Sequence, residues 1–143
     1  MSGFPTVPEA PADMLELARV MKARAYAPYS RFAVGAVVRG ESGRLYGGCN
    51  VENAAYPQSS CAEAAAITAL VAGGERRVTE ALLLAGGPDL VTPCGGCRQR
   101  LREFASDATS IHLCGEGEVR TLTLGELLPL SFGPRHLGQN PDQ

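Results

Sequence analysis

The sequence predicts one α/β domain, a three-layer α/β/α sandwich built on a mixed sheet of about five strands. One observation is the order of the patterned segments, which is helix, strand, strand, helix, strand, helix, strand, strand. Another is size, because 143 residues with 45% hydrophobic and 20% charged residues suffice for one buried core. We place this domain at 13–136, between a flexible leader at 1–12 and a flexible tail at 137–143.

The first helix is predicted from Asp13 to the residues just before Pro28. Asp13 and Glu16 have the spacing of a capping box, and Pro28 ends the helix. One helical face collects the apolar residues Met14, Leu17, Ala18, Met21 and Ala25.

Two strands are expected next, at 31–40 and 44–51, joined by a hairpin turn of Gly, Glu, Ser and Gly.

The second helix, at about 61–72, is apolar on every side. Between Ala64 and Ala72 the only polar side chain is that of Thr68, and Gly73 with Gly74 ends the helix. A helix that is apolar all round is buried all round, yet a sheet covers only one side of it. We infer that something else covers the other side, most simply a second copy of the chain.

The later elements are shorter. Thr92 is placed to cap a third helix with Pro93 in its first turn, and Thr123 with Glu126 forms a capping box for a brief last helix. The first of the remaining strands is continuously apolar, as expected of a strand covered on both faces. These strands are predicted at 81–86, 110–114 and 119–124.

Charge and composition exclude several classes of partner. The net charge is -2, and the longest basic run is the Arg76-Arg77 pair, so neither a nucleic acid nor a membrane is expected as a partner. No segment approaches the ~18 apolar residues of a membrane span, and the N-terminus lacks the pattern of a secretory signal. Five cysteines without an export signal predict reduced thiols in the cytoplasm rather than a disulfide framework.

Three cysteines lie at the starts of two predicted helices. Cys61 opens the second helix, while Cys94 and Cys97 lie one turn apart at the start of the third. Helix N-termini favour thiolates, and both starts follow strand ends, so they can meet at one edge of the sheet. Three thiolates bind Zn²⁺ tetrahedrally and leave the fourth position to water, which is typical of catalytic zinc.

Glu63 lies two residues after Cys61 and is the only charged side chain between Glu52 and Glu75. At this offset it can reach a water on the metal without binding the metal. We therefore predict that Glu63 moves protons between this water and a substrate.

Each of these features also has a plainer interpretation. Ser60 and Glu63 form a capping box, so the glutamate could simply close a helix end. A Cys-x-x-Cys pair at a helix start is also typical of dithiol oxidoreductases. The conjunction of a third cysteine with a glutamate at the right offset favours the zinc site.

The other cysteines and histidines are left outside the site. Cys49 and Cys114 belong to strand patterns and are expected to be ordinary buried residues. His112 lies in a strand and His136 in a polar tail, and neither has a partner at metal-ligand spacing.

The sequence resembles the small, homotetrameric cytidine deaminases. The resemblance is carried by "YAPYSRFAVGAVV", "GCNVENAAYPQSSCAEAAAI", "TPCGGCRQRLREF" and "ELLPLSFGP", which together span most of the chain. It implies one Zn²⁺ per chain, a nucleoside substrate, and a tetramer with shared active sites. It also implies that Cys61, Cys94 and Cys97 bind zinc and that Glu63 is the proton shuttle.

The resemblance further implies a set of substrate contacts. Phe32 is similar to an aromatic residue that packs on the pyrimidine ring; without the resemblance it would simply be core. Asn50 and Glu52 match a pair that holds the ribose hydroxyls, and in an extended segment they point to one side; a strand-end turn with a solvated carboxylate is the alternative. The remaining pocket residues implied are Tyr56, Ala62 and, from a neighbouring subunit, Phe132.

One position departs from the pattern. Many relatives follow "CAE" with an arginine that hydrogen-bonds the thiolates, whereas this chain has Ala64. Zinc with three thiolates carries a net negative charge, so without that cation the bound water is harder to ionise. We expect the helix N-termini to offset most of this charge, with Arg98 leaning toward the sulfurs as a second contribution.

The implied reaction is hydrolysis of cytidine and 2'-deoxycytidine to uridine and 2'-deoxyuridine with release of ammonia, a step of pyrimidine salvage. Zinc-bound hydroxide would attack the 4-carbon of the ring. A deaminase of the blasticidin S type is the alternative within the family. Outside it remain a dithiol oxidoreductase and a zinc-stabilised binding module, which would need a fourth protein ligand.

Overall fold

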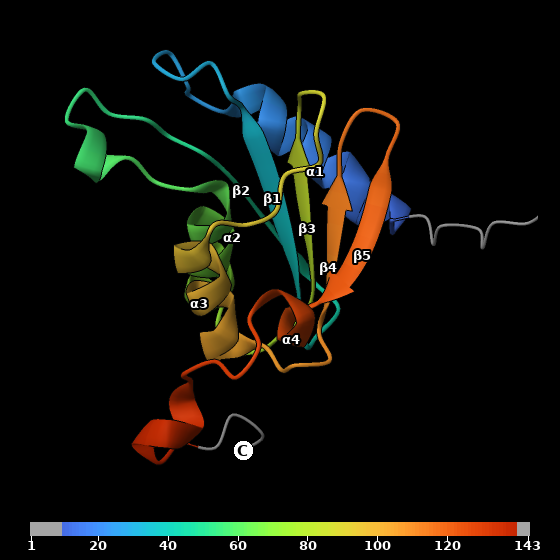
Figure 1. Ribbon diagram of the computed structural model, residues 1–143, viewed down its shortest axis with the longest axis vertical. Coiled ribbons are helices and arrows are strands. Elements are labelled where there is room, and N and C mark those ends of the chain that lie inside the picture. The colour runs from blue at the N-terminus through green and yellow to red at the C-terminus, as the bar shows by residue number, and fades with distance from the viewer. Residues whose placement is uncertain (1–9, 140–143) are drawn as a thin grey trace, which may run out of the picture.

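Five strands form one mixed sheet in the order β2-β1-β3-β4-β5, with helices on both faces (Figure 1). The computed structural model describes residues 10–139. Only the β3/β4 pair is parallel; the other neighbouring strands run antiparallel. The elements are α1 (Ala12–Arg24), β1 (Val34–Gly40), β2 (Leu45–Cys49), η1 (Tyr56–Gln58), α2 (Ala62–Ala72), β3 (Val78–Ala85), α3 (Gly95–Phe104), β4 (Ser110–Cys114), β5 (Val119–Thr123), α4 (Leu124–Leu127) and η2 (Pro134–Leu137).

The central strand β1 shows how the two cores form. Successive side chains of a strand point to opposite faces, so Ala36 and Val38 face α2 and α3 while Val37 faces α1. Met14 and Ala18 of α1 pack with Val37 in the smaller core. The three-layer α/β/α sandwich with a mixed five-stranded sheet is confirmed.

The first helix differs from its prediction at both ends. It begins at Ala12 with Pro11 as N-cap, and no side chain caps it, so the predicted capping box at Asp13 is wrong. The Asp13 carboxylate instead accepts from Arg39 Nη2 at 3.0 Å. The helix ends at Arg24 because Tyr26 is already paired in extended form: its N–H donates to the carbonyl of Asn50.

The third helix begins at Gly95 with Cys94 as N-cap, so the prediction that Thr92 caps it with Pro93 in the first turn is wrong. The Arg98 side chain explains the difference. Its Nε donates to the carbonyl of Pro93 at 2.7 Å and its Nη2 donates to the hydroxyl of Thr92 at 2.9 Å. The Thr92 hydroxyl and the Pro93 carbonyl therefore accept from the arginine. The cap of α4 is confirmed, since Thr123 Oγ1 accepts from the backbone N–H of Glu126.

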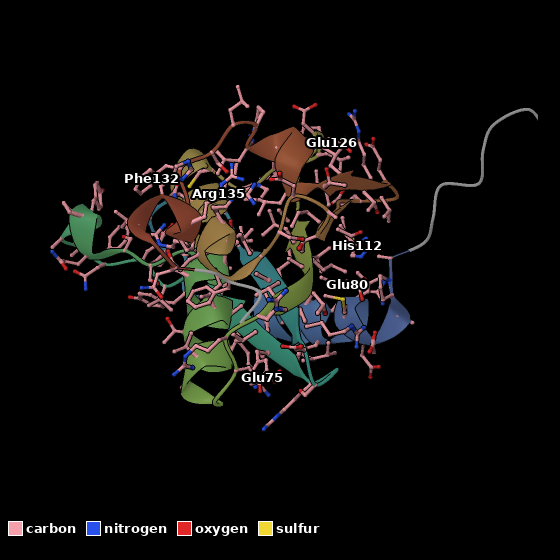
Figure 2. The ribbon with its side chains drawn as sticks, turned by 90° about the horizontal axis from the view of Figure 1, so that it is seen from below. Glu75, Glu80, His112, Glu126, Phe132 and Arg135 are labelled. Carbon is pink, nitrogen blue, oxygen red and sulfur yellow. The ribbon has the colours of Figure 1, made fainter. Side chains whose placement is uncertain are left out.

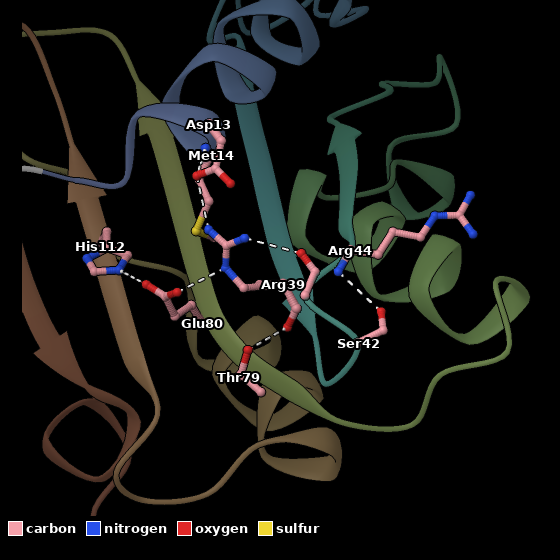
Figure 3. A network of polar contacts seen from close by, with 9 residues as sticks. Asp13, Met14, Arg39, Ser42, Arg44, Thr79, Glu80 and His112 are labelled. Atoms are coloured by element: carbon pink, nitrogen blue, oxygen red, sulfur yellow. Dashed lines mark hydrogen bonds and ion pairs between the residues drawn. The ribbon is translucent and has the colours of Figure 1, made fainter.

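A chain of ion pairs fastens α1 to the sheet (Figure 3). Arg39 of β1 bridges Asp13 of α1 and Glu80 of β3, with N–O distances of 3.0 Å to each. His112 extends the chain, because its Nε2 lies 2.8 Å from Glu80 and its Nδ1 lies 2.9 Å from the Thr121 hydroxyl. The His112 side chain therefore belongs to a structural hydrogen-bond network on the α1 side of the sheet.

The helix α2 is covered on one side only. Ala62, Ala66, Ile67 and Leu70 are buried against the sheet and α3, while Thr68 and Ala72 are exposed and the side chains beside them half-buried. Within residues 10–139 nothing covers that side. In the same part of the chain, no helix is both long and apolar enough to cross a membrane.

The predicted leader and tail lie largely outside the described residues, which begin at residue 10 and end at residue 139. Of the predicted leader, Ala10 is buried in the α1 core and Ala12 already belongs to the helix. Of the tail, Leu137 belongs to η2.

Candidate functional site

Two helix starts bring three sulfur atoms together. Cys61 is the N-cap of α2, Cys94 is the N-cap of α3, and Cys97 lies in the first turn of α3. The three sulfur atoms all lie within 4.8 Å of one another. Zinc–sulfur bonds of about 2.3 Å in a tetrahedron place sulfur atoms just under 4 Å apart, so small rotations of these side chains suffice to bind the ion.

Backbone dipoles favour the thiolate of Cys94. Its sulfur accepts from the backbone N–H of Cys97 and, more weakly, of Gly96, and these contacts lower the pKa of the Cys94 thiol despite its partial burial. The N–H of Cys97 is free for this role because Cys97 lies in the first turn of α3, where backbone N–H groups have no acceptor within the helix.

Cys97 is the least accessible of the three ligand candidates, with 0% of its surface exposed. Burial, the neighbouring Glu63 carboxylate and Cys61 all raise the pKa of the Cys97 thiol. A divalent cation reverses this balance because it deprotonates a coordinating thiol outright. The buried sulfur of Cys97 beside the thiolate-like sulfur of Cys94 is a donor set that fits Zn²⁺.

The cluster leaves room for a fourth, non-protein ligand. Among residues 10–139, no other His, Cys, Asp or Glu joins the three sulfurs. All five cysteines are free, and Cys49 and Cys114 lie outside the cluster, Cys114 in the α1 core. A closed four-ligand structural site is therefore not present in the described part of the chain.

A cavity of about 340 Å³ lies elsewhere, under the C-terminal segment, and contains none of the predicted site residues. Beside the sulfurs lies another, of about 300 Å³. Glu63 lines it together with Cys61 and Cys94, which places a carboxylate next to the metal ligands but outside the ligand set. The other lining residues are Phe32, Val34, Asn50, Glu52, Ser59, Ser60, Ala62, Leu83, Val91 and Thr92.

The capping-box interpretation of Glu63 is not supported. In the described residues no side-chain hydrogen bond caps the N-terminus of α2, and the N-cap is Cys61 rather than Ser60. The Glu63 carboxylate is therefore not used as a cap and remains available in the cavity.

Asn50 and Phe32 are fixed relative to each other by the backbone. The Asn50 amide donates from Nδ2 to the carbonyl of Phe32 at 2.7 Å and accepts at Oδ1 from the N–H of Val34 at 2.8 Å. Since Val34 N–H must meet an oxygen, the orientation of the amide is determined. One N–H of Asn50 is left for another acceptor, and the Phe32 ring lines the cavity half-exposed.

Glu52 holds the loop that carries Phe32. Its Oε1 accepts from the backbone N–H groups of Tyr29 at 2.9 Å and Ser30 at 3.0 Å, and its Oε2 accepts from the Ser30 hydroxyl. The Ser30 contacts, followed by that of Tyr29, lower the pKa of Glu52. The next residue, Arg31, has a left-handed φ of 59°, so this tight loop is held against a backbone preference.

Two predicted pocket residues do not line the cavity beside the sulfurs. Tyr56 is carried outward by η1, is 69% exposed, and lines an adjoining cavity of about 300 Å³ with Tyr29, so its assignment to the substrate pocket stays a prediction. Phe132 lies near Arg135 in the C-terminal segment (Figure 2), is 58% exposed, and stacks on His136 with ring centroids 5.2 Å apart. Its assignment to a neighbouring subunit's pocket stays a prediction.

The predicted lean of Arg98 toward the sulfurs is wrong. Its guanidinium donates to oxygens only, and one of these is the carbonyl of Leu127 at 2.7 Å. The arginine that approaches a sulfur is Arg100, whose Nη1 lies 3.8 Å from Cys97 Sγ. Helical spacing could have revealed this, because Arg100 lies three residues after Cys97 and therefore on the same helix face.

Comparison with known proteins gives a consistent family. A family model described as "Cytidine and deoxycytidylate deaminase zinc-binding region" matches residues 8–113. A cytidine deaminase of Sporosarcina psychrophila is 38% identical over 130 residues, covering 89% of this chain and 96% of the relative. A cytidine deaminase of Mycobacterium tuberculosis is 43% identical over 111 residues, covering 78% and 80% of the two chains.

Solved structures agree. The crystal structure of a cytidine deaminase from Burkholderia pseudomallei matches with a TM-score of 0.81 at 35% identity, covering 87% of this chain and all of that one. That of a Mycobacterium tuberculosis cytidine deaminase matches with a TM-score of 0.73 at 39% identity, covering 85% and 96%. The chain therefore belongs to the cytidine deaminase family of zinc-dependent hydrolases.

Proposed function

We propose that the protein hydrolyses cytidine and 2'-deoxycytidine to uridine and 2'-deoxyuridine, releasing ammonia. The observation that carries this proposal is that three sulfurs and a non-ligand glutamate, Glu63, border one cavity that also presents an aromatic ring and paired polar side chains. Membership of the family supports the same reaction. A volume of about 300 Å³ lies at the lower end of the range for small-molecule sites.

Cys61, Cys94 and Cys97 would hold Zn²⁺, which supplies Lewis-acid activation of water when bound. Glu63 takes a proton from the attacking water and delivers it to the ring nitrogen next to the 4-carbon, while a C–O bond forms at that carbon. Glu63 then takes the proton of the new hydroxyl group on the 4-carbon and passes it to the exocyclic amine, so that a C=O bond forms as the C–N bond breaks and ammonia leaves. One water is consumed for each ammonia released, and the glutamate returns to its starting state.

The lining of the cavity favours a nucleoside over a nucleotide. Of the described residues that line it, none is Lys or Arg, and Glu52 adds a negative charge. A phosphate there would lack the cations that it needs and would be repelled by the carboxylate. Asn50 has one unused N–H, and Phe32 offers a ring face, which suits a sugar hydroxyl and a pyrimidine respectively.

The alternatives have less support. A dithiol oxidoreductase would not need Cys61 beside the Cys-x-x-Cys pair, and a binding module would need a fourth ligand that the described residues do not offer. A deaminase of the blasticidin S type would share the zinc site. The Asn50 and Glu52 pair, which lines the same cavity, favours a ribosyl substrate over blasticidin S.

A substrate panel with the zinc-loaded protein tests the proposal. We expect the ultraviolet absorbance change of deamination with cytidine and 2'-deoxycytidine, and at most slow change with deoxycytidylate or blasticidin S. Equal amounts of ammonia and uridine would fix the stoichiometry. Turnover of deoxycytidylate in preference to both nucleosides would contradict the proposed substrate class.

We also propose that the active protein is a homotetramer with shared active sites that works in the cytoplasm. The uncovered apolar side of α2 supports this, as does Phe132, an exposed aromatic side chain that does not line the cavity of its own chain. The free state of all five thiols suits a reducing compartment. Sedimentation velocity tests the assembly, with Thr68→Arg on the uncovered side of α2 expected to dissociate it.

A further inference from the structure

The zinc-loaded sulfur cluster would carry a negative charge that no described residue lining the cavity offsets. Zinc with three thiolates carries a net charge of -1, and Glu63 lines the same cavity as a further anion. Position 64, next to Glu63, is an alanine. Uncompensated negative charge in a partly buried site disfavours the thiolate form and weakens the hold on the metal.

Arg100 lies where a compensating cation would act. Its Nη1 is 3.8 Å from the sulfur of Cys97, the fully buried one of the three ligands. Within residues 10–139 the structure gives the Arg100 side chain no other polar partner, so no carboxylate competes for the guanidinium. Its charge does not depend on pH in the ordinary range, because arginine stays protonated.

Gly96 makes the approach possible. A Cβ built on Gly96 would lie 3.2 Å from Arg100 Nη1 and 4.0 Å from Cys94 Sγ. The guanidinium therefore lies over the start of α3, close to Gly96 and to the sulfur of Cys97. A Cβ on the preceding Gly95 would meet no atom within 4 Å, so only the second glycine of this pair is needed for the contact.

We propose that Arg100 is a positioning residue whose guanidinium donates to the Cys97 sulfur, offsets the negative charge of the three-sulfur ligand set and thereby strengthens zinc binding. Arg98, the other cation at this helix start, is committed to three oxygen acceptors and does not supply that charge. The inference rests on the proposed zinc site but not on the identity of the substrate. It concerns the ligand sulfur directly and therefore predicts a change in metal affinity.

Zinc dissociation constants measured by chelator competition test this. For Arg100→Gln we expect about tenfold weaker binding, within the 10- to 100-fold range known for groups that support metal ligands. Arg100→Lys, which keeps the charge, should recover most of the affinity. Arg120→Gln on the edge strand β5 removes the same charge away from the cavity and should bind zinc like the parent protein. Unchanged affinity in Arg100→Gln, or equal weakening in Arg100→Lys, would overturn the proposal.

A second pair of variants moves the guanidinium without removing it. Gly96→Ala should weaken zinc binding in the same direction by a smaller factor, while Gly95→Ala should not. Equal affinity in the two glycine variants would count against the contact. Failure of the proposed function is separable, because a parent protein that deaminates no nucleoside but shows this order of zinc affinities leaves the role of Arg100 standing.

Discussion

The guanidinium of Arg98 donates a 2.7 Å hydrogen bond to the carbonyl oxygen of Leu127, 29 positions away. The same side chain donates to the Pro93 carbonyl and the Thr92 hydroxyl. It thereby ties the loop before Cys94 to the end of α4. One planar, five-donor group serves three acceptors on two segments, which a lysine cannot do from a single ammonium.

Arg98→Lys should therefore lower the free energy of unfolding by about 2 kcal/mol, the scale of one or two hydrogen bonds to a charged group. Urea denaturation of the metal-loaded protein measures this, with Arg120→Lys as a matched exchange on an exposed site. A free energy of unfolding equal to that of the control would show that the hydrogen bonds of Arg98 do not contribute to stability.

Glu63→Gln should reduce turnover by at least about a hundredfold while zinc content stays at one per chain. The amide keeps the size of the carboxylate but does not accept a proton at neutral pH. Metal analysis and steady-state kinetics on the same preparation separate the two effects, and Glu103→Gln on the exposed side of α3 serves as control. Substantial activity in Glu63→Gln would remove the glutamate from the mechanism.

Cys94→Ala should lose zinc and much of the stability that zinc confers, since metal binding is coupled to folding. Cys49→Ala, which removes a sulfur outside the cluster, should keep both. Thermal unfolding with and without a chelator checks this directly. The chelator should lower the Tm of the parent protein and of Cys49→Ala, and should leave the Tm of Cys94→Ala unchanged.

The zinc ligands could be predicted because their signal is local. Cys61 and Glu63 are two residues apart, and Cys94 and Cys97 are three residues apart. Each pair lies at a helix start, whose positive partial charge favours the thiolates. The layers could be predicted for a similar reason, because period and composition along each segment decide which side is buried.

What failed depends on partners that are distant in sequence. The end of α1 is set by Tyr26 pairing with Val51, and the Arg98 side chain that occupies Pro93 is held by the carbonyl of Leu127, 29 positions away. Neither contact can be recognised from the residue pattern of the local sequence. The hydrogen bonds between Ser30 and Glu52 could not be predicted either, because 22 positions separate the two residues.

Glu52 gives a pH-dependent prediction. Hydrogen bonds from Ser30 and Tyr29 lower its pKa below the usual 4.5, so they favour the ionised carboxylate. Their contribution to stability is present above pH 4.5 and is lost as the pH falls through the lower, folded-state pKa. The loop bearing Phe32 should therefore loosen only in more acidic solution than an ordinary glutamate would require.

Ser30→Ala should raise the pKa of Glu52 toward 4.5, as measured by NMR titration of the side-chain carboxyl carbon. Ser42→Ala is the matched control, because Ser42 makes the equivalent contacts to Glu75, whose pKa is also lowered. Each variant should move its own glutamate only. A pKa of Glu52 that is unchanged in Ser30→Ala would mean that the backbone N–H groups alone hold the carboxylate.

Gly48 permits the close approach of β2 to the start of α2. A Cβ at this position would lie 2.5 Å from the carbonyl oxygen of Ala62 and 2.5 Å from the nitrogen of Ala66, both backbone atoms that cannot move alone. At Gly47 a Cβ would instead meet the Met21 side chain at 2.8 Å on the opposite face, and that chain is flexible.

Gly48→Ala should therefore cost about 2 kcal/mol of stability, a usual value for overpacking, and Gly47→Ala clearly less. Because α2 must shift, Cys61 at its N-cap shifts with it, and Gly48→Ala should also bind zinc more weakly. Urea denaturation and chelator competition on the two variants give both quantities. A Gly48→Ala protein as stable as Gly47→Ala, with the zinc affinity of the parent, would show that α2 is not held at this distance by the glycine.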